Sequence, residues 1–144
     1  MTDEQAERLL DAIRNLPPYV FVMIGLYAGL RREEILALQW DSVYLDTDTP
    51  YLTVRRAWHT EHNRPVISDE LETKAAGTKY PLPVCLAECL KAAKETSTSE
   101  YVVSNRDGEP LSYTQFKRLW QYVVTRTVKE RSYYRYEDGK KRVK

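Results

Sequence analysis

The sequence is poor in the residues that build metal centres: among 144 residues there are two cysteines and two histidines. Cys85 and Cys89 are one helical turn apart within an apolar pattern, which predicts buried free thiols facing the core. Their spacing is not the short C-x-x-C of a zinc site. His59 and His62 form a His-x-x-His pair on a predicted hairpin, where solvated side chains are the usual outcome. We therefore expect no metal ion and no cofactor.

Long hydrophobic runs, a signal peptide and a strong net charge are also absent. Without the first two, we expect no membrane association and a cytoplasmic location. The formal net charge is +1, so the composition lacks the basic excess of an obvious nucleic-acid binder. The charges are nevertheless uneven, with an acidic first dozen residues and a basic end. This asymmetry predicts a polyanionic partner near the C-terminal half, with contacts from Arg135, Lys140, Lys141 and Arg142.

Apolar residues at helical spacing indicate several amphipathic or buried helices. Two of these begin with the pattern of a capping box, in which a Ser or Thr precedes a Gln by three residues: Thr2 with Gln5, and Ser112 with Gln115. The predicted helices cover residues 2–16, 18–26, 32–39, 83–95 and 112–130. The aromatic stripe of the last one, which includes Phe116 and Trp120, is predicted to belong to the core.

The middle of the chain changes to a period of two and is rich in β-branched and aromatic residues, which predicts strands. Three of them, over residues 51–58, 64–68 and 78–82, are expected to form one small antiparallel sheet with turns at Asn63 and at 75–77. The fold class is therefore α+β, mostly helical with a small three-stranded antiparallel sheet, and one domain over residues 1–144 is the default. Residues 132–144 supply few apolar side chains and are predicted to be a basic tail or a hairpin.

The most informative stretch is residues 27–40, where an arginine follows a glycine at the mouth of an apolar helical pattern. Gly29 can adopt a backbone angle that other residues resist, so the chain can turn and present Arg31. The planar guanidinium suits two phosphate oxygens at once, which predicts an anion site. Glu34, three residues later, is close enough on a helix to support either Arg31 or the helix itself. A helix start with solvated charges is the competing interpretation.

The order of these parts resembles the catalytic domain of the tyrosine recombinases, the phage integrase family. The stretch Ala28-Gly-Leu-Arg-Arg-Glu-Glu-Ile-Leu-Ala-Leu-Gln-Trp40 is similar to the first-arginine box of that family. The stretch Thr73-Lys-Ala-Ala-Gly-Thr-Lys-Tyr-Pro-Leu-Pro83 resembles its hairpin with the catalytic lysine. Residues 101–112, followed by an aromatic-rich helix, resemble the approach to its second catalytic box. The resemblance implies an integrase-type catalytic core that covers most of the chain.

For this sequence, the resemblance implies roles for a small set of residues in DNA strand cleavage and rejoining through a 3′-phosphotyrosine intermediate. Arg31 would bind the scissile phosphate and stabilise its growing charge, with Glu34 in support. Lys74 would be the general acid that protonates the leaving sugar oxygen, although Lys79 is a competitor for this role. The implied partners are duplex DNA and other recombinase protomers. The candidate DNA-binding residues are Arg32, Lys79, Arg135, Lys140, Lys141 and Arg142.

The family's reaction also needs a His-x-x-Arg box and an attacking tyrosine, and neither can be placed in this sequence. Neither histidine has an arginine three residues later, and Tyr133, Tyr134 and Tyr136 precede the position that the resemblance gives to the nucleophile. We therefore expect an N-terminal portion of a catalytic domain that is inactive alone and also lacks the family's preceding core-binding domain. The alternative is a non-catalytic DNA-binding or regulatory module that retains the fold.

Overall fold

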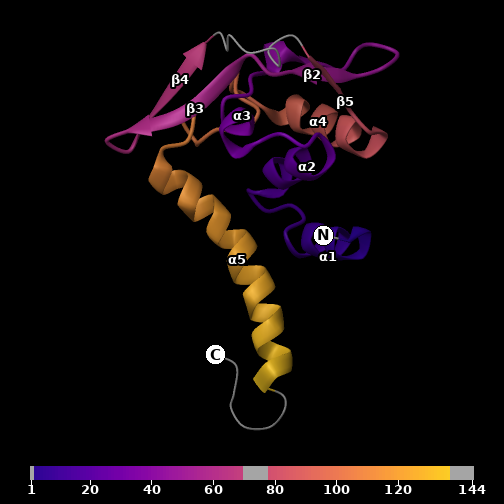
Figure 1. The fold of residues 1–144 in the computed structure, drawn as a ribbon, viewed down its shortest axis with the longest axis vertical. Coiled ribbons are helices and arrows are strands. Elements are labelled where there is room, and N and C mark those ends of the chain that lie inside the picture. Colours follow the sequence, from indigo (N-terminus) through magenta and orange to yellow (C-terminus); the bar gives the residue numbers. More distant parts are fainter. Residues whose placement is uncertain (1, 70–77, 137–144) are drawn as a thin grey trace. The chain divides into compact units, whose positions relative to one another are not determined.

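The computed structural model describes residues 2–69 and 78–136, with side chains described for 2–68 and 78–125 (Figure 1). The chain divides into two compact units, Val20–Phe116 and the two chain ends up to residue 19 and from residue 117. The helices are α1 (Asp3–Ala12), α2 (Tyr19–Tyr27), α3 (Arg32–Leu36), α4 (Val84–Thr96), α5 (Tyr113–Tyr136) and the short 3-10 helix η1 (Trp40–Ser42). The strands are β1 (Val43–Tyr44), β2 (Tyr51–Thr53), β3 (Arg56–Glu61), β4 (Arg64–Asp69) and β5 (Lys79–Pro81).

Both predicted capping boxes are present at helix starts. At α1, the Thr2 hydroxyl accepts from the Gln5 backbone N–H, and the side-chain oxygen Oε1 of Gln5 accepts from the Thr2 backbone N–H. Ser112 and Gln115 exchange the same two hydrogen bonds at α5. These bonds satisfy N–H groups that have no partner within the first helical turn, which fixes where each helix begins.

Three predicted helix ends are wrong. Helix α3 ends at Leu36 and not at residue 39, because the chain leaves the helix at Ala37 and Gln39 is extended ahead of η1. Helix α1 ends at Ala12 and not at residue 16, because the chain leaves the helical region and Asn15 adopts a positive φ of 64°. Asparagine tolerates this left-handed conformation better than most residues. Helix α5 continues to Tyr136, beyond the predicted end at residue 130, so residues 132–136 are helical and not part of a tail or hairpin. No glycine or proline interrupts the sequence from residue 113 to 136. Residues 137–144 lie outside the described residues.

The core of the larger unit is formed by apolar side chains from α2, α3, α4 and the strands. Helix α2 has no polar face, as the sequence predicted, and four consecutive side chains in it are buried. The largest fully buried hydrophobic side chains of this unit are Ile24, Ile35, Leu36, Leu52, Leu86, Leu90 and Val54. Trp58 is buried as well, and its indole N–H donates to the carbonyl oxygen of Leu111 at 2.8 Å.

The strands form two small antiparallel sheets, and the predicted single sheet is wrong in its pairing. Strand β2 lies between β1 and β5, whereas β3 and β4 pair only with each other. The predicted strand over residues 51–58 is interrupted at Val54 and Arg55, so its two halves join different sheets. Val43–Tyr44, which the sequence analysis did not assign to a strand, takes the third place beside β2. The α+β class with small antiparallel sheets is confirmed.

The β3–β4 hairpin turns at His62 and Asn63, which both have positive φ angles of 53° and 67°. Two consecutive left-handed residues match the twist of a tight hairpin, so the predicted turn at Asn63 is confirmed. The Asn63 side-chain oxygen also accepts from the N–H and hydroxyl of Thr114 and thereby caps the start of α5. The other predicted turn, at residues 75–77, lies outside the described residues.

The predicted burial of Cys85, Cys89 and Trp120 is wrong. On α4, Leu86 and Leu90 occupy the buried face, which leaves Cys85 exposed and Cys89 half-buried. Partial burial raises the pKa of the Cys89 thiol. On α5, Trp120 and Val124 are 40% and 37% exposed, in contrast to the buried Phe116, Leu119 and Val123. In the part of the chain that the structure describes, no helix has the length and hydrophobicity needed to cross a membrane.

Candidate functional site

The glycine-arginine stretch forms a tight connection between α2 and α3. Gly29 follows the end of α2 and has a φ of +71°, which confirms the predicted left-handed conformation. Leu30 is buried and anchors the connection in the core. Arg31 then takes an extended conformation, with φ −79° and ψ 159°, as the residue before the first turn of α3. The backbone at Arg31 is therefore fixed on both sides by a turn and a helix.

Glu34 acts on the backbone of this connection. Its carboxylate oxygen Oε1 accepts from the Arg31 backbone N–H at 2.8 Å. An arginine side chain has no acceptor, so only this half of a capping box is available at Arg31. Of the two roles left open by the sequence, the structure therefore displays support of the helix start and not an ion pair with the guanidinium.

The Arg31 side chain is exposed, and within residues 2–68 and 78–125 its guanidinium forms no ion pair or hydrogen bond. A cation held on a fixed backbone with its donors free can receive an anion without first breaking an internal pair. This arrangement fits the anion site that the sequence predicted, and its ligand remains a prediction.

Arg32, the next residue, is placed differently. Its guanidinium carbon lies 5.3 Å from the ring centre of Phe116 and 5.7 Å from that of Trp58. Its Nη2 atom also lies 3.2 Å from the Glu33 carboxylate. These contacts hold the side chain over the aromatic core and partly neutralise its charge. Arg32 is thus a weaker candidate for a phosphate contact than Arg31, although its predicted DNA-binding role stays a prediction.

Lys79 begins β5 and is exposed, with its ammonium nitrogen 4.7 Å from the ring centre of Tyr51. Lys74 lies outside the described residues, so its distance from Arg31 and its competition with Lys79 stay open. Lys140, Lys141 and Arg142 lie outside them too. The backbone of Arg135 belongs to α5, and its predicted DNA contact also stays a prediction.

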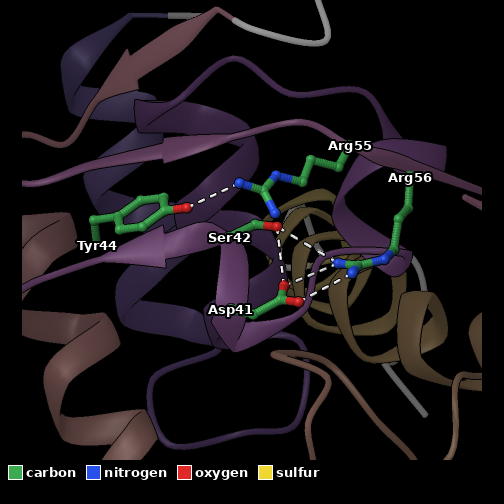
Figure 2. Close-up of polar contacts among 5 residues, drawn as sticks. All are labelled: Asp41, Ser42, Tyr44, Arg55 and Arg56. Atoms are coloured by element: carbon green, nitrogen blue, oxygen red, sulfur yellow. Dashed lines mark hydrogen bonds and ion pairs between the residues drawn. The ribbon is translucent and has the colours of Figure 1, made fainter. Parts of the chain in front are cut away.

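A polar cluster around η1 was not singled out by the sequence (Figure 2). The Arg56 guanidinium donates to both carboxylate oxygens of Asp41, at 2.9 and 3.0 Å, and to the hydroxyl of Ser42 at 3.5 Å. This pairing, more than any other cause, lowers the pKa of Asp41. The Arg56 side chain is only 17% exposed. The Arg56 side chain therefore links β3 to η1.

Arg55 turns to a different partner, as Figure 2 shows. Its Nη2 atom donates to the hydroxyl of Tyr44 at 3.1 Å. The only sequence signal for this cluster is the Arg-Arg pair itself, in a segment that otherwise follows the pattern of a strand. Sequence spacing could not tell which arginine is buried, because the strand is interrupted between β2 and β3.

Metal ligands do not gather in the described part of the molecule. No group of three or more His, Cys, Asp or Glu side chains lies together in residues 2–68 and 78–125. His59 lies 3.8 Å from Glu61, and both are exposed on the hairpin.

Comparisons with known proteins agree on one family. An integrase of Streptomyces ambofaciens is 24% identical, over 86% of this chain and 35% of its own length. Among solved structures, the integrase of the Tn1549 transposon in complex with circular intermediate DNA superposes with a TM-score of 0.73 at 16% identity, over 90% of this chain and 46% of that one. The XerA recombinase gives a TM-score of 0.57 at 12% identity, over 89% and 42%.

The chain thus spans about a third to a half of the length of these relatives. The structural likeness concerns the same α+β arrangement described above. Residues 1–135 match the Phage integrase family, and the chain belongs to this family.

Proposed function

We propose that this chain binds duplex DNA as part of a site-specific recombinase, with Arg31 in contact with the phosphate that is cleaved. The observation that carries the proposal is the exposed Arg31 guanidinium, held on a backbone fixed by Gly29 and Glu34. Such a preorganised cation stabilises the charge that grows on a phosphate oxygen during attack. Two relatives support the DNA partner, and one of them is a Tn1549 integrase bound to circular intermediate DNA. The other is a lambda integrase tetramer bound to a Holliday junction.

In the proposed reaction, a tyrosine oxygen attacks the scissile phosphorus while the bond from phosphorus to the 5′ sugar oxygen breaks. The products are a 3′-phosphotyrosine and a free 5′ hydroxyl, and rejoining reverses these steps. Lys74 would supply the proton to the leaving 5′ oxygen. The tyrosine and the second arginine of this reaction are not assigned to any residue of this sequence. Association with other protomers, as in the tetrameric relative, and a cytoplasmic location belong to the same proposal.

The DNA proposal is tested by titrating a labelled duplex with the chain at several salt concentrations. We expect binding at low salt that weakens as salt rises, because each phosphate contact releases counterions. Arg31→Gln should weaken binding and leave the thermal midpoint nearly unchanged, since its side chain has no partner within the described residues. Arg8→Gln is the matched control: it removes the same charge from an arginine that is 71% exposed and paired with Glu4. No binding by the wild-type chain at low salt would refute the proposal.

The role of Lys74 is tested by strand cleavage with the recombinase of which this chain is proposed to be a part. Lys74→Ala should slow cleavage strongly on normal DNA and much less when sulfur replaces the leaving oxygen, because a thiolate leaves without protonation. Lys79→Ala is the matched control. If Lys79→Ala shows the sulfur rescue and Lys74→Ala does not, the acid is Lys79.

A further inference from the structure

We propose that Arg55 and Lys79, supported by Tyr44 and Tyr51, form a second contact surface for the phosphate backbone of duplex DNA, in addition to Arg31. This inference rests on the proposed DNA binding and names further residues for it. The four residues are called the tyrosine-supported basic patch below.

The patch is built on the paired strands β1, β2 and β5. Tyr44 and Tyr51 are direct partners in the β1–β2 register, and their rings stack with centres 4.7 Å apart and planes inclined by 21°. Lys79 pairs with Thr53 in the β2–β5 register, which makes it a diagonal neighbour of Tyr51. Its ammonium lies over the Tyr51 ring, and Arg55 donates to the Tyr44 hydroxyl. One continuous chain of contacts therefore links the two cations.

The patch occupies the sheet face opposite the core. Side chains alternate between the two faces of a strand, and the neighbouring residues Val43 and Leu52 are 5% and 0% exposed. Tyr44 and Tyr51 point the other way and are only half-buried, whereas Arg55 and Lys79 are exposed. The two cationic groups are thus accessible to a large partner.

The partners of the two cations leave their charge intact. A phenol is uncharged at neutral pH, so the contacts with Tyr44 and Tyr51 orient Arg55 and Lys79 without neutralising them. Arg56 provides the contrast, because its charge is matched by both oxygens of Asp41. The exposed carboxylates of the β1–β2 loop, Asp46 and Asp48, form no ion pair with Arg55 or Lys79 in the residues that the structure describes. The charge of Arg55 makes a minor contribution to lowering the pKa of Asp41, but the hydrogen bonds of that carboxylate go to Arg56.

Oriented cations that form no ion pair in the described residues, on a sheet face, fit a regularly spaced polyanion. Only Thr78 separates Lys79 from the segment 70–77, which contains the proposed general acid Lys74, so the patch lies close to that segment along the chain. The tyrosine rings are already engaged with each other and with the lysine. The contact should therefore be to phosphate and carry no base preference.

The test measures the dependence of DNA affinity on salt for Arg55→Gln, Lys79→Gln and the double variant, with duplexes of two unrelated sequences. Each lost phosphate contact should reduce the slope of log K against log salt by about 0.9. We expect that reduction in each single variant, roughly twice that in the double variant, and the same values on both duplexes. Arg55→Lys retains the charge and should restore most of the slope.

Arg8→Gln and Lys91→Gln are the matched controls, since each removes one exposed positive charge outside the patch. Slopes of the patch variants equal to those of the controls would overturn the inference. A wild-type chain that does not bind DNA at low salt would instead refute the proposed function itself. Tyr44→Phe removes only the acceptor of Arg55, and it should weaken binding less than Arg55→Gln. A larger effect of Tyr44→Phe would assign the contact to the hydroxyl and overturn the role of Arg55.

Discussion

Glu34 offers a direct test of how the arginine connection is held in place. In the structure its carboxylate accepts from the Arg31 backbone N–H at 2.8 Å and does not pair with the guanidinium. An amide oxygen can accept the same bond, so Glu34→Gln should retain it. Glu34→Ala removes the acceptor and leaves the first N–H of the α3 start without its side-chain partner.

The expected size of the effect follows from the energetics of helix caps. Loss of such a side-chain acceptor costs about 1 kcal/mol of stability. For a domain of this size that corresponds to a thermal midpoint lower by about 4 °C. Glu34→Gln should stay within about 0.5 kcal/mol of the wild type, as exposed substitutions that keep their bonds do. Circular dichroism melts of the two variants provide this comparison.

Glu33→Gln is the control, because it removes a carboxylate from the same helical turn. The Glu33 carboxylate contacts the Arg32 side chain and not the Arg31 backbone. An exposed pair of this kind contributes little, so its midpoint should hardly change. DNA affinity supplies a second measurement: Glu34→Gln removes a negative charge beside Arg31 and should bind as well as the wild type or better. If Glu34→Gln lowers stability or affinity as much as Glu34→Ala does, the carboxylate acts through its charge on Arg31 and our reasoning is wrong.

Two further predictions concern stability. Gly29→Ala should lower the free energy of unfolding by about 1–2 kcal/mol, because Gly29 has a positive φ that an alanine adopts only with strain. The added methyl group would meet no described atom within 4 Å, so no new contact or clash changes this value. An unchanged urea midpoint would contradict the prediction. The Asp41 pKa is lowered in the folded chain, chiefly by Arg56, so its contribution is present above the aspartate pKa of about 4 and is lost as the pH falls below it. The wild type should therefore lose more stability than Asp41→Asn between neutral pH and pH values below about 4, and parallel pH profiles would show that the pair adds nothing.

The sequence was sufficient for the features that depend on local chemistry. The two capping boxes, the left-handed Gly29 and the turn at Asn63 each follow from a few neighbouring residues whose side chains or backbone preferences decide the outcome. The apolar helix α2 was equally evident, because a segment without a polar face has to be buried. The α+β class followed from the change of hydrophobic period along the chain.

Strand pairing could not be predicted in the same way, because it depends on which residues the folded chain brings together. Residues 51–58 carry one uninterrupted strand pattern, yet β2 and β3 join different sheets. The break allows Arg56 to reach Asp41 and Trp58 to donate to Leu111, and both partners are distant in sequence. The burial of Leu86 and Leu90 in place of Cys85 and Cys89 likewise reflects a helix rotation that periodicity alone leaves free.

The two arginine pairs of this chain show why charge counts alone predict binding surfaces poorly. In each pair one side chain already has partners within the protein. Arg32 contacts two aromatic rings and Glu33, and Arg56 pairs with Asp41. The other member, Arg31 or Arg55, is exposed and forms no ion pair in the described residues. A net charge of +1 therefore hides exposed cations that form no ion pair in the described part of the chain. Because a cation without an ion-pair partner can receive a phosphate directly, the partner of each arginine indicates DNA binding better than the composition does.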